Sequence, residues 1–204
     1  MDFLGLKVTT VADVYEPSDD TELLAKAVER LAFGSVLDLG CGTGAVGIIA
    51  AKRAEVKKVF CSDVNPGAVG LARINAKANG VENKIEFFVG DLFQPFKGKK
   101  NGKMFFDTIA FNPPYLPTKK REKLGGKINY AFDGGAGGRE TTGKFLASAP
   151  EHLRPGGMIL LVCSSLSGIG RTVSCLEKEG FAAKKISGRR FFFEEICVLS
   201  ARKD

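Results

Sequence analysis

Short apolar runs alternate along this chain with amphipathic stretches of helical length. The runs are typical of buried strands, and they cover residues 35–39, 59–62, 85–89, 106–111 and 158–164. The amphipathic stretches have the period of helices, and they cover residues 19–31, 45–54, 66–78, 141–149 and 170–179. Regular alternation of strand and helix predicts a mostly parallel sheet with helices on both of its faces.

The end of the chain departs from this alternation. Two further apolar runs, 181–186 and 192–199, follow each other without room for a helix between them. They must therefore pair as an antiparallel hairpin at one edge of the sheet. The sequence predicts one α/β domain over residues 1–204, with seven strands and an N-terminal helix at about 19–31. Ser18 precedes that helix and is its expected N-cap.

Amino-acid composition limits the partners and the cellular compartment that we expect for this domain. The formal net charge of +7 favours an anionic partner such as RNA, a nucleoprotein or an acidic protein, although a basic protein without such a partner is equally compatible. The five cysteines form no Cys-x-x-Cys pair and there is a single histidine, so we expect reduced thiols and no metal site. No apolar run is long enough to cross a bilayer. We expect a cytoplasmic protein.

The candidate chemistry lies in Asn112-Pro113-Pro114-Tyr115, directly after the fourth strand. Each proline holds the residue before it extended, so Asn112 and Pro113 form a stiff corner. This corner presents the side-chain oxygen of Asn112 and the backbone oxygen of Pro113 beside the ring of Tyr115. Two acceptors next to a flat surface suit a planar group that ends in –NH2, such as an amide, an adenine or a cytosine. A proline-rich turn without chemistry is the alternative.

Polar residues at other strand ends indicate a cofactor site. In parallel sheets, ligands bind beyond the carboxyl ends of the strands, where this sequence has Asp38, Asp63 and Asp91. Glycines at 40, 42 and 44 allow a ligand to approach the backbone closely. Residues 42–47 also match a dinucleotide fingerprint, so an NAD-binding module is an alternative. However, Asp38 would repel a pyrophosphate and attract a cation, which favours S-adenosylmethionine.

The chain resembles the class I methyltransferases, a Rossmann-like family, and within them the HemK-type glutamine methyltransferases of translation release factors. The resemblance covers nearly the whole chain. Within this family, the chain is most similar to the short archaeal and eukaryotic branch, which lacks the helical domain that bacterial relatives carry before the glycine loop. The motifs that carry it are Tyr-Glu-Pro-Ser-Asp-Asp-Thr at 15–21, Asp-Leu-Gly-Cys-Gly-Thr-Gly at 38–44, Asp-Val-Asn-Pro at 63–66, Asn-Pro-Pro-Tyr at 112–115, Gly-Gly at 134–135 and Gly-Arg-Glu at 138–140.

The resemblance implies roles for individual residues. Asn112 and Pro113 would hold the amide of the glutamine in the Gly-Gly-Gln motif of a class I release factor, with Tyr115 packing over it. S-adenosylmethionine would be bound by Thr21, Asp38, Gly40, Gly42, Asp63, Asp91, Leu92 and Asn112. We expect Asp38 and Gly40 near its methionine part, Asp63 at the ribose and Asp91 at the adenine. No general base is expected, because the phenol of Tyr115 titrates too high and His152 reads as a residue at a helix end.

The resemblance also implies partners. The short branch works with a small zinc-binding activator subunit that adds a strand to the edge strand 85–89, and Phe88 is either a contact for it or buried under a helix. Lysines 119, 120, 123 and 127 in the 116–139 loop could contact RNA or an acidic factor, and the lysine-rich stretch 97–103 is a solvated loop with RNA contact as a weaker option. Relatives often have a Trp before the Gly-Gly segment, where this chain has Phe132 and Asp133.

Rival functions use the same corner. Methylation of adenine or cytosine amino groups in RNA or DNA would stack a flipped base on Tyr115. Methylation of a protein lysine is another possibility, although an aliphatic amine matches two planar acceptors less well. A non-catalytic cofactor-binding module is a third.

Overall fold

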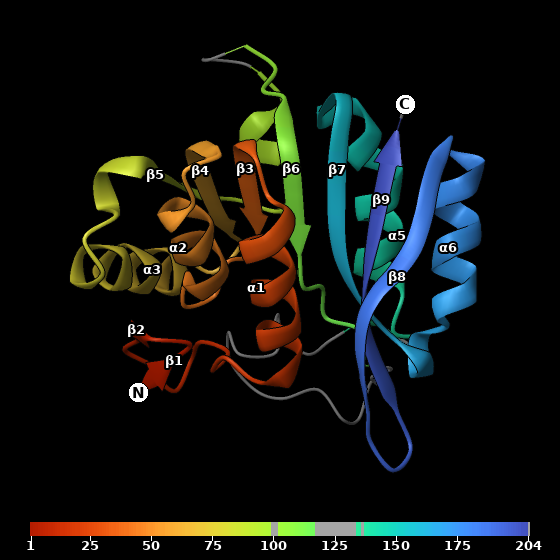
Figure 1. Ribbon diagram of the computed structural model, residues 1–204, viewed down its shortest axis with the longest axis horizontal. Coiled ribbons are helices and arrows are strands. Elements are labelled where there is room, and N and C mark those ends of the chain that lie inside the picture. The colour runs from red at the N-terminus through yellow and green to blue at the C-terminus, as the bar shows by residue number, and fades with distance from the viewer. Residues whose placement is uncertain (99–101, 117–133, 136, 204) are drawn as a thin grey trace.

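Seven strands form the central sheet in the order β5-β4-β3-β6-β7-β9-β8 (Figure 1). The computed structural model describes residues 1–98, 102–116, 134–135 and 137–203. Strands β3 to β7 run parallel to one another, and β9 runs antiparallel to both of its neighbours. This confirms the expected mostly parallel sheet with an antiparallel C-terminal hairpin. The strands are β3 (Gly34–Leu39), β4 (Val56–Asp63), β5 (Ile85–Val89), β6 (Phe106–Phe111), β7 (Leu153–Ser164), β8 (Phe181–Arg190) and β9 (Glu195–Lys203).

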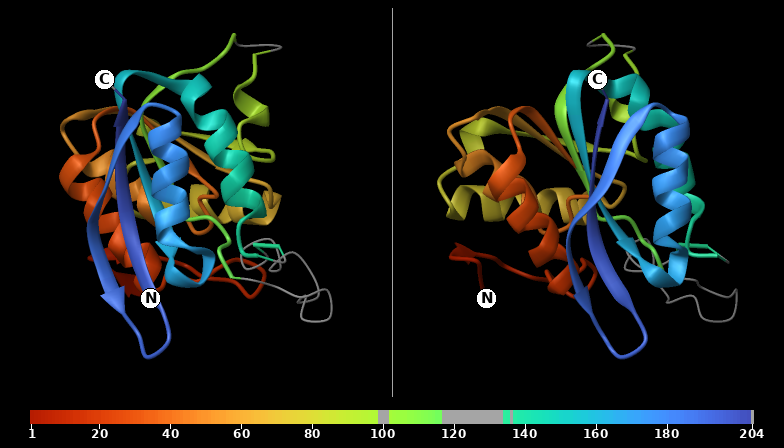
Figure 2. Two further views of the ribbon diagram at one scale, coloured as in Figure 1. Left: turned by 90° about the vertical axis from the view of Figure 1, so that its right-hand side faces the viewer. Right: turned by 45° about the vertical axis from the view of Figure 1, so that its right-hand side comes forward.

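Helices cover both faces of this sheet (Figure 2). One face packs against α1 (Asp19–Leu31), α2 (Ala45–Lys52) and α3 (Pro66–Ala78), which contribute buried residues such as Leu24, Ile48 and Ala72. The other face packs against α5 (Glu140–Ser148) and α6 (Ile169–Lys178) through Phe145 and Leu176. Four short 3-10 helices join the larger elements: η1 (Glu82–Lys84), η2 (Gln94–Phe96), η3 (Ala149–His152) and η4 (Ser165–Ser167).

The C-terminal hairpin is longer than its apolar residues indicated. Arg190 pairs with Glu195 at its end, and the backbone N–H of Phe191 donates to the carbonyl of Glu194 at 2.7 Å, which closes the turn. The expected strand 192–199 therefore begins too early, since Phe192 and Phe193 lie in the turn and are 94% and 85% exposed. A run of phenylalanines has the same hydrophobicity in a strand and in an exposed turn, so the pattern could not separate the two.

A short N-terminal ribbon was not predicted. Strands β1 (Asp2–Phe3) and β2 (Leu6–Lys7) pair through a turn in which Leu4 and Gly5 both have positive φ. The ribbon is fastened to α3, where the side chain of Asn75 accepts from the backbone N–H of Thr9 at 2.8 Å. Two-residue strands leave no periodic signal in the sequence.

Phe88 and His152 both pack against aromatic side chains on the α5/α6 face of the sheet. Phe88 on β5 is partly buried, and its ring meets Phe96 edge-on at 5.1 Å, so it packs in an aromatic cluster and not on an open edge. His152 ends η3, stacks on Phe93 at 4.6 Å and contacts the carbonyl of Met104 through Nδ1 at 2.9 Å. Its role is structural. Among the described residues, no helix is both long and apolar enough to cross a bilayer.

Candidate active site

The expected site residues converge on one pocket at the carboxyl ends of β3, β4 and β6. Its volume is about 630 Å³. The residues that the sequence singled out all line it: Thr21, Asp38, Gly40, Gly42, Asp63, Asp91, Leu92, Asn112, Pro113 and Tyr115. Ligand sites of parallel sheets lie at this edge, so the position agrees with the fold.

The glycine loop between β3 and α2 lines the pocket, and one glycine at its end and another in the first turn of α2 leave no room for a side chain. A Cβ on Gly44, whose φ is +82°, would lie 2.8 Å from the Cβ of Ala72 on α3. A Cβ on Gly47, in the first turn of α2, would lie 2.4 Å from the sulfur of Cys61. These glycines let α2 approach α3 and β4 closely, and the backbone of the loop faces the pocket.

Asp38 is a buried carboxyl group at the base of this loop. One oxygen, Oδ2, accepts from the backbone N–H of Gly47 at 2.8 Å, and the residue is 3% exposed. Burial raises the pKa of Asp38 to about 7, with the nearby charge of Asp63 adding to the shift and the Gly47 bond opposing it. A cationic ligand would favour the ionised form of this group.

Asp63, at the end of β4, shapes the loop as well as lining the pocket. Its two oxygens accept from the backbone N–H groups of Gly42 at 3.0 Å and Asn65 at 2.8 Å. Burial raises the pKa of Asp63, and those hydrogen bonds counteract the shift. Further round the pocket, Asp91 is exposed and Leu92 has a φ of +46°. A left-handed conformation is costly for leucine, and such strain is concentrated at functional sites.

The corner after β6 holds an unpaired acceptor. Oδ1 of Asn112 is buried and has no hydrogen-bond partner in the part of the chain that the structure describes. Buried polar atoms are nearly always paired, so an orphaned acceptor in a pocket is best explained by a donor on a ligand. This geometry fits the expected role of Asn112 as an acceptor for an –NH2 group.

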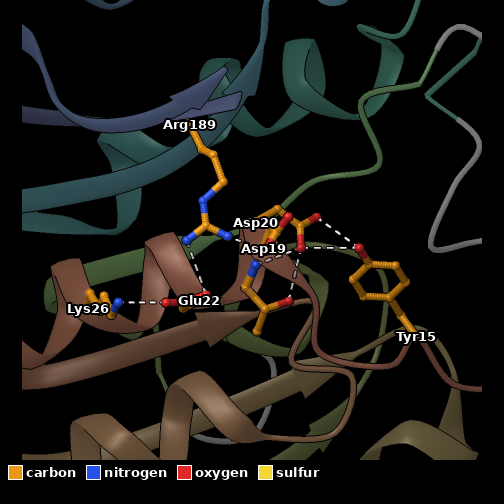
Figure 3. A network of polar contacts seen from close by, with 7 residues as sticks. Tyr15, Asp19, Asp20, Glu22, Lys26 and Arg189 are labelled. Carbon is orange, nitrogen blue, oxygen red and sulfur yellow. Dashed lines mark hydrogen bonds and ion pairs between the residues drawn. The ribbon is translucent and has the colours of Figure 1, made fainter. Parts of the chain in front are cut away.

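Tyr115 is held in place by a residue that sequence reasoning missed. Its hydroxyl donates to Oδ2 of Asp20 at 3.0 Å. The hydroxyl of Tyr15 donates to both oxygens of the same carboxylate at 3.1 Å (Figure 3). Burial and the negative charge of Asp20 raise the pKa of both phenols, so both stay protonated. Tyr115 is therefore a donor and a packing surface, not a base. The only signal for Asp20 was its place in the 15–21 motif.

Ser18 at the start of α1 and Gly134 beside the Asn-Pro-Pro-Tyr corner are two further positions that the sequence motifs had indicated. Ser18 occupies the N-cap position of α1 as expected, but its side chain makes no capping hydrogen bond to the helix. Gly134 packs against the corner itself, since its N–H donates to the carbonyl of Leu116 at 3.1 Å and a Cβ on it would lie 2.8 Å from the carbonyl oxygen of Pro114. Lysines 119, 120, 123 and 127, together with Phe132 and Asp133, lie outside the described residues, as does part of the 97–103 stretch.

The sequence is similar to those of known proteins. Residues 8–128 match the family model of the methyltransferase small domain. The chain is 41% identical over 197 residues to a proposed protein N5-glutamine methyltransferase of Methanocaldococcus jannaschii, covering 97% of this chain and 95% of that protein. It is 33% identical to the release factor glutamine methyltransferase of Geobacter sulfurreducens over 86% of this chain, which spans 60% of that protein.

A solved structure extends the similarity to the fold. The chain superposes on a structure of the E. cuniculi Mtq2–Trm112 complex, described as responsible for methylation of the eRF1 translation termination factor, with a TM-score of 0.66 and 25% identity. The match covers 94% of this chain and 99% of that one.

Proposed function

This chain belongs to the methyltransferase small-domain family and, within it, to the protein N5-glutamine methyltransferases, and we propose that it methylates the Gly-Gly-Gln glutamine of a class I translation release factor. The methyl donor is S-adenosylmethionine, as in the family. Two similarities support this choice of substrate. One relative is named as a release factor glutamine methyltransferase, and the similar solved structure is described as methylating eRF1.

The observation that carries the proposal is the orphaned Oδ1 of Asn112. A glutamine amide has two N–H donors in one plane, and pairing one of them with this oxygen would satisfy the buried acceptor. The backbone carbonyl of Pro113 is the proposed acceptor for the other. The protonated phenol of Tyr115, fixed by Asp20, would cover the face of the amide.

The residues of the pocket also fit the cofactor. Asp38 is a buried carboxyl group that a cation would stabilise, and Asp63 already orders the glycine loop. We propose that Thr21, Asp38, Gly40, Gly42, Asp63, Asp91, Leu92 and Asn112 contact it. When bound, S-adenosylmethionine supplies an electrophilic methyl group.

The acceleration would come from holding the amide rather than from removing its proton before the transfer. After the transfer, the methylated nitrogen would release one proton to water, and S-adenosylhomocysteine would leave as the other product. An amide nitrogen is a weak nucleophile because its lone pair is delocalised, and acceptors on its N–H groups raise its electron density and fix its direction. Neither tyrosine of the site can act as a base at neutral pH, since both phenols have a raised pKa.

We also propose a partner and a setting. The similar Mtq2 is in complex with Trm112, so we propose a small zinc-binding activator subunit on the edge strand β5 of this chain, with the reaction taking place in the cytoplasm where release factors act. Contact with RNA through the lysine-rich loops remains part of the proposal.

The test is mass spectrometry of a purified release factor after incubation with the chain, the activator and S-adenosylmethionine. The expected result is a single methyl group on the Gly-Gly-Gln glutamine. Asn112→Ala should lower the methylation rate by about 100-fold or more while cofactor binding persists. The matched control is Asn83→Ala, an exposed asparagine in η1. Methyl groups found only in RNA, or only on lysine, would overturn the proposed substrate.

A further inference from the structure

Among the residues that the structure describes, the two most exposed apolar side chains lie close in sequence to Glu194, a residue of the pocket. Phe192 and Phe193 are 94% and 85% exposed, Phe191 is 41% exposed, and the rings of Phe192 and Phe193 meet edge-on at 4.8 Å. We call residues 191–193 the phenylalanine tip. They occupy the turn of the β8–β9 hairpin. This turn projects beyond the sheet on the side where β3 and β6 have their carboxyl ends (Figure 1). Large exposed aromatic side chains in a group mark interaction sites.

The phenylalanine tip is continuous with the pocket. The next residue, Glu194, lines the pocket, and its Oε1 accepts from the hydroxyl of Ser164 at the end of β7 at 2.5 Å. The backbone N–H of Glu195 donates to Oγ of Ser165 at 2.9 Å. These bonds fix the base of the turn to the same end of the sheet as the methylation site.

A second set of contacts anchors the hairpin from its other strand. Arg189, near the end of β8, pairs with Asp19 and lies 3.4 Å from Glu22, both in the first turn of α1 (Figure 3). That turn also carries Asp20, which binds Tyr15 and Tyr115. The tip is thus held in a defined position relative to the corner that receives the substrate.

We propose that the phenylalanine tip is a docking site for the substrate protein, separate from the pocket that receives its glutamine. The inference rests on the proposed function, because a glutamine that is part of a folded protein brings the surrounding protein surface over the mouth of the pocket. The tip directly precedes Glu194, which lines the pocket, and its rings would insert into an apolar depression on this surface.

Charged side chains flank the tip on both sides. Arg190 precedes it with a side chain that is 85% exposed and lies 3.6 Å from Glu195, while Glu194 and Glu195 follow it. These opposite charges balance one another, so the proposed docking contact is the apolar one made by the rings. Aromatic and arginine side chains are the groups that contribute most to binding at protein interfaces.

The experiment compares F192S/F193S with F105S in methylation of the intact release factor by the chain in complex with its activator. Phe105 is also exposed, but it directly precedes β6 and therefore lies at the amino-terminal end of that strand, away from the pocket at the carboxyl ends. For F192S/F193S we expect KM for the release factor to rise about 10-fold or more, with kcat at saturation and the Kd of S-adenosylmethionine unchanged. F105S should leave all three values unchanged. A benzophenone amino acid at position 192, but not at 105, should crosslink to the release factor.

Each other outcome overturns a defined statement. Unchanged KM in F192S/F193S, or an equal loss in F105S, overturns the docking site and leaves the proposed function standing. The docking site is also overturned if the wild-type chain forms a dimer, or binds phosphatidylserine vesicles, and F192S/F193S abolishes that association without changing KM. If the wild-type complex does not methylate the release factor at all, the proposed function falls and the docking site falls with it.

Discussion

Asp38 shows how one buried side chain makes cofactor binding depend on pH. Its folded pKa of about 7 lies above the ordinary value of 3.8, because burial penalises the charge. The unliganded fold therefore favours protonated Asp38, and its stability decreases as the pH rises towards and through 7. A cationic ligand reverses this preference, because only the ionised form attracts it.

We therefore predict that S-adenosylmethionine binds more weakly at pH 6 than at pH 8, by a factor of about 3 to 10. Isothermal titration calorimetry across pH 5.5–8.5 measures the effect. Asp38→Asn should bind more weakly at pH 8 and lose most of the pH dependence, although Asp63, whose pKa is also raised, retains a part of it. A wild-type affinity that does not change between pH 6 and 8 would contradict the role of Asp38.

Asp20 is a second residue with a large expected effect. It accepts from two phenols at once, and an asparagine has one acceptor oxygen in place of two. Asp20→Asn should lower the free energy of unfolding by about 1–3 kcal/mol and reduce kcat, because the hydrogen bonds from Tyr15 and Tyr115 lose their charged acceptor and an NH2 group replaces one of the two acceptor oxygens. Thermal or urea unfolding and steady-state kinetics measure the two effects. Glu29→Gln removes a charge from the exposed side of the same helix and should change neither.

At the scale of elements, strands with an apolar run could be predicted from the sequence, and polar extensions of strands could not. Strands β5 and β6 lie where the sequence placed them, although only the apolar run of β6 coincides with buried positions, since Ile85 is the one buried residue of β5. The second half of β8, residues 187–190, was missed because an edge strand exposes polar residues such as Arg190 to water. In the site, glycines, aspartates and the Asn-Pro-Pro-Tyr corner were readable as local motifs. The bond from Tyr115 to Asp20 joins residues 95 positions apart, and no local pattern reports it.

The contact between the Gly-Gly segment and the corner gives a prediction at this scale. In Gly134→Ala, the new methyl group would lie 2.8 Å from backbone atoms of both Pro114 and Gly138, so the corner must shift. We expect kcat/KM to fall about 10-fold or more while the Kd of S-adenosylmethionine stays within about 3-fold, since the glycine loop is untouched. The control is Gly137→Ala, where a Cβ meets nothing within 4 Å. Equal activity of the two variants would show that Gly134 does not support the corner.

The whole molecule presents two sheet edges of different character. The outer edge, β8, carries exposed lysine and arginine side chains, which discourage another strand from pairing there. The opposite edge, β5, has only five residues and ends at Val89, which is 53% exposed. Phe88 is partly buried against Phe96 and offers less exposed surface there than Val89. If the activator subunit adds a strand to the sheet, β5 is the edge that fits it, and Val89 is the exposed apolar side chain beside it.

This assignment predicts the effect of Val89→Lys. The charge should abolish copurification of the activator and lower methylation to the level of the chain alone, because strand addition would bury the lysine without a partner. The isolated variant should unfold within about 0.5 kcal/mol of the wild type, as for most exposed substitutions. Val11→Lys, a change of the same kind at a residue 48% exposed in the N-terminal segment, is the control and should bind the activator normally. Copurification and full activity of Val89→Lys would place the activator on another surface, and equal activity of the wild-type chain with and without the activator would remove the subunit from the proposed function.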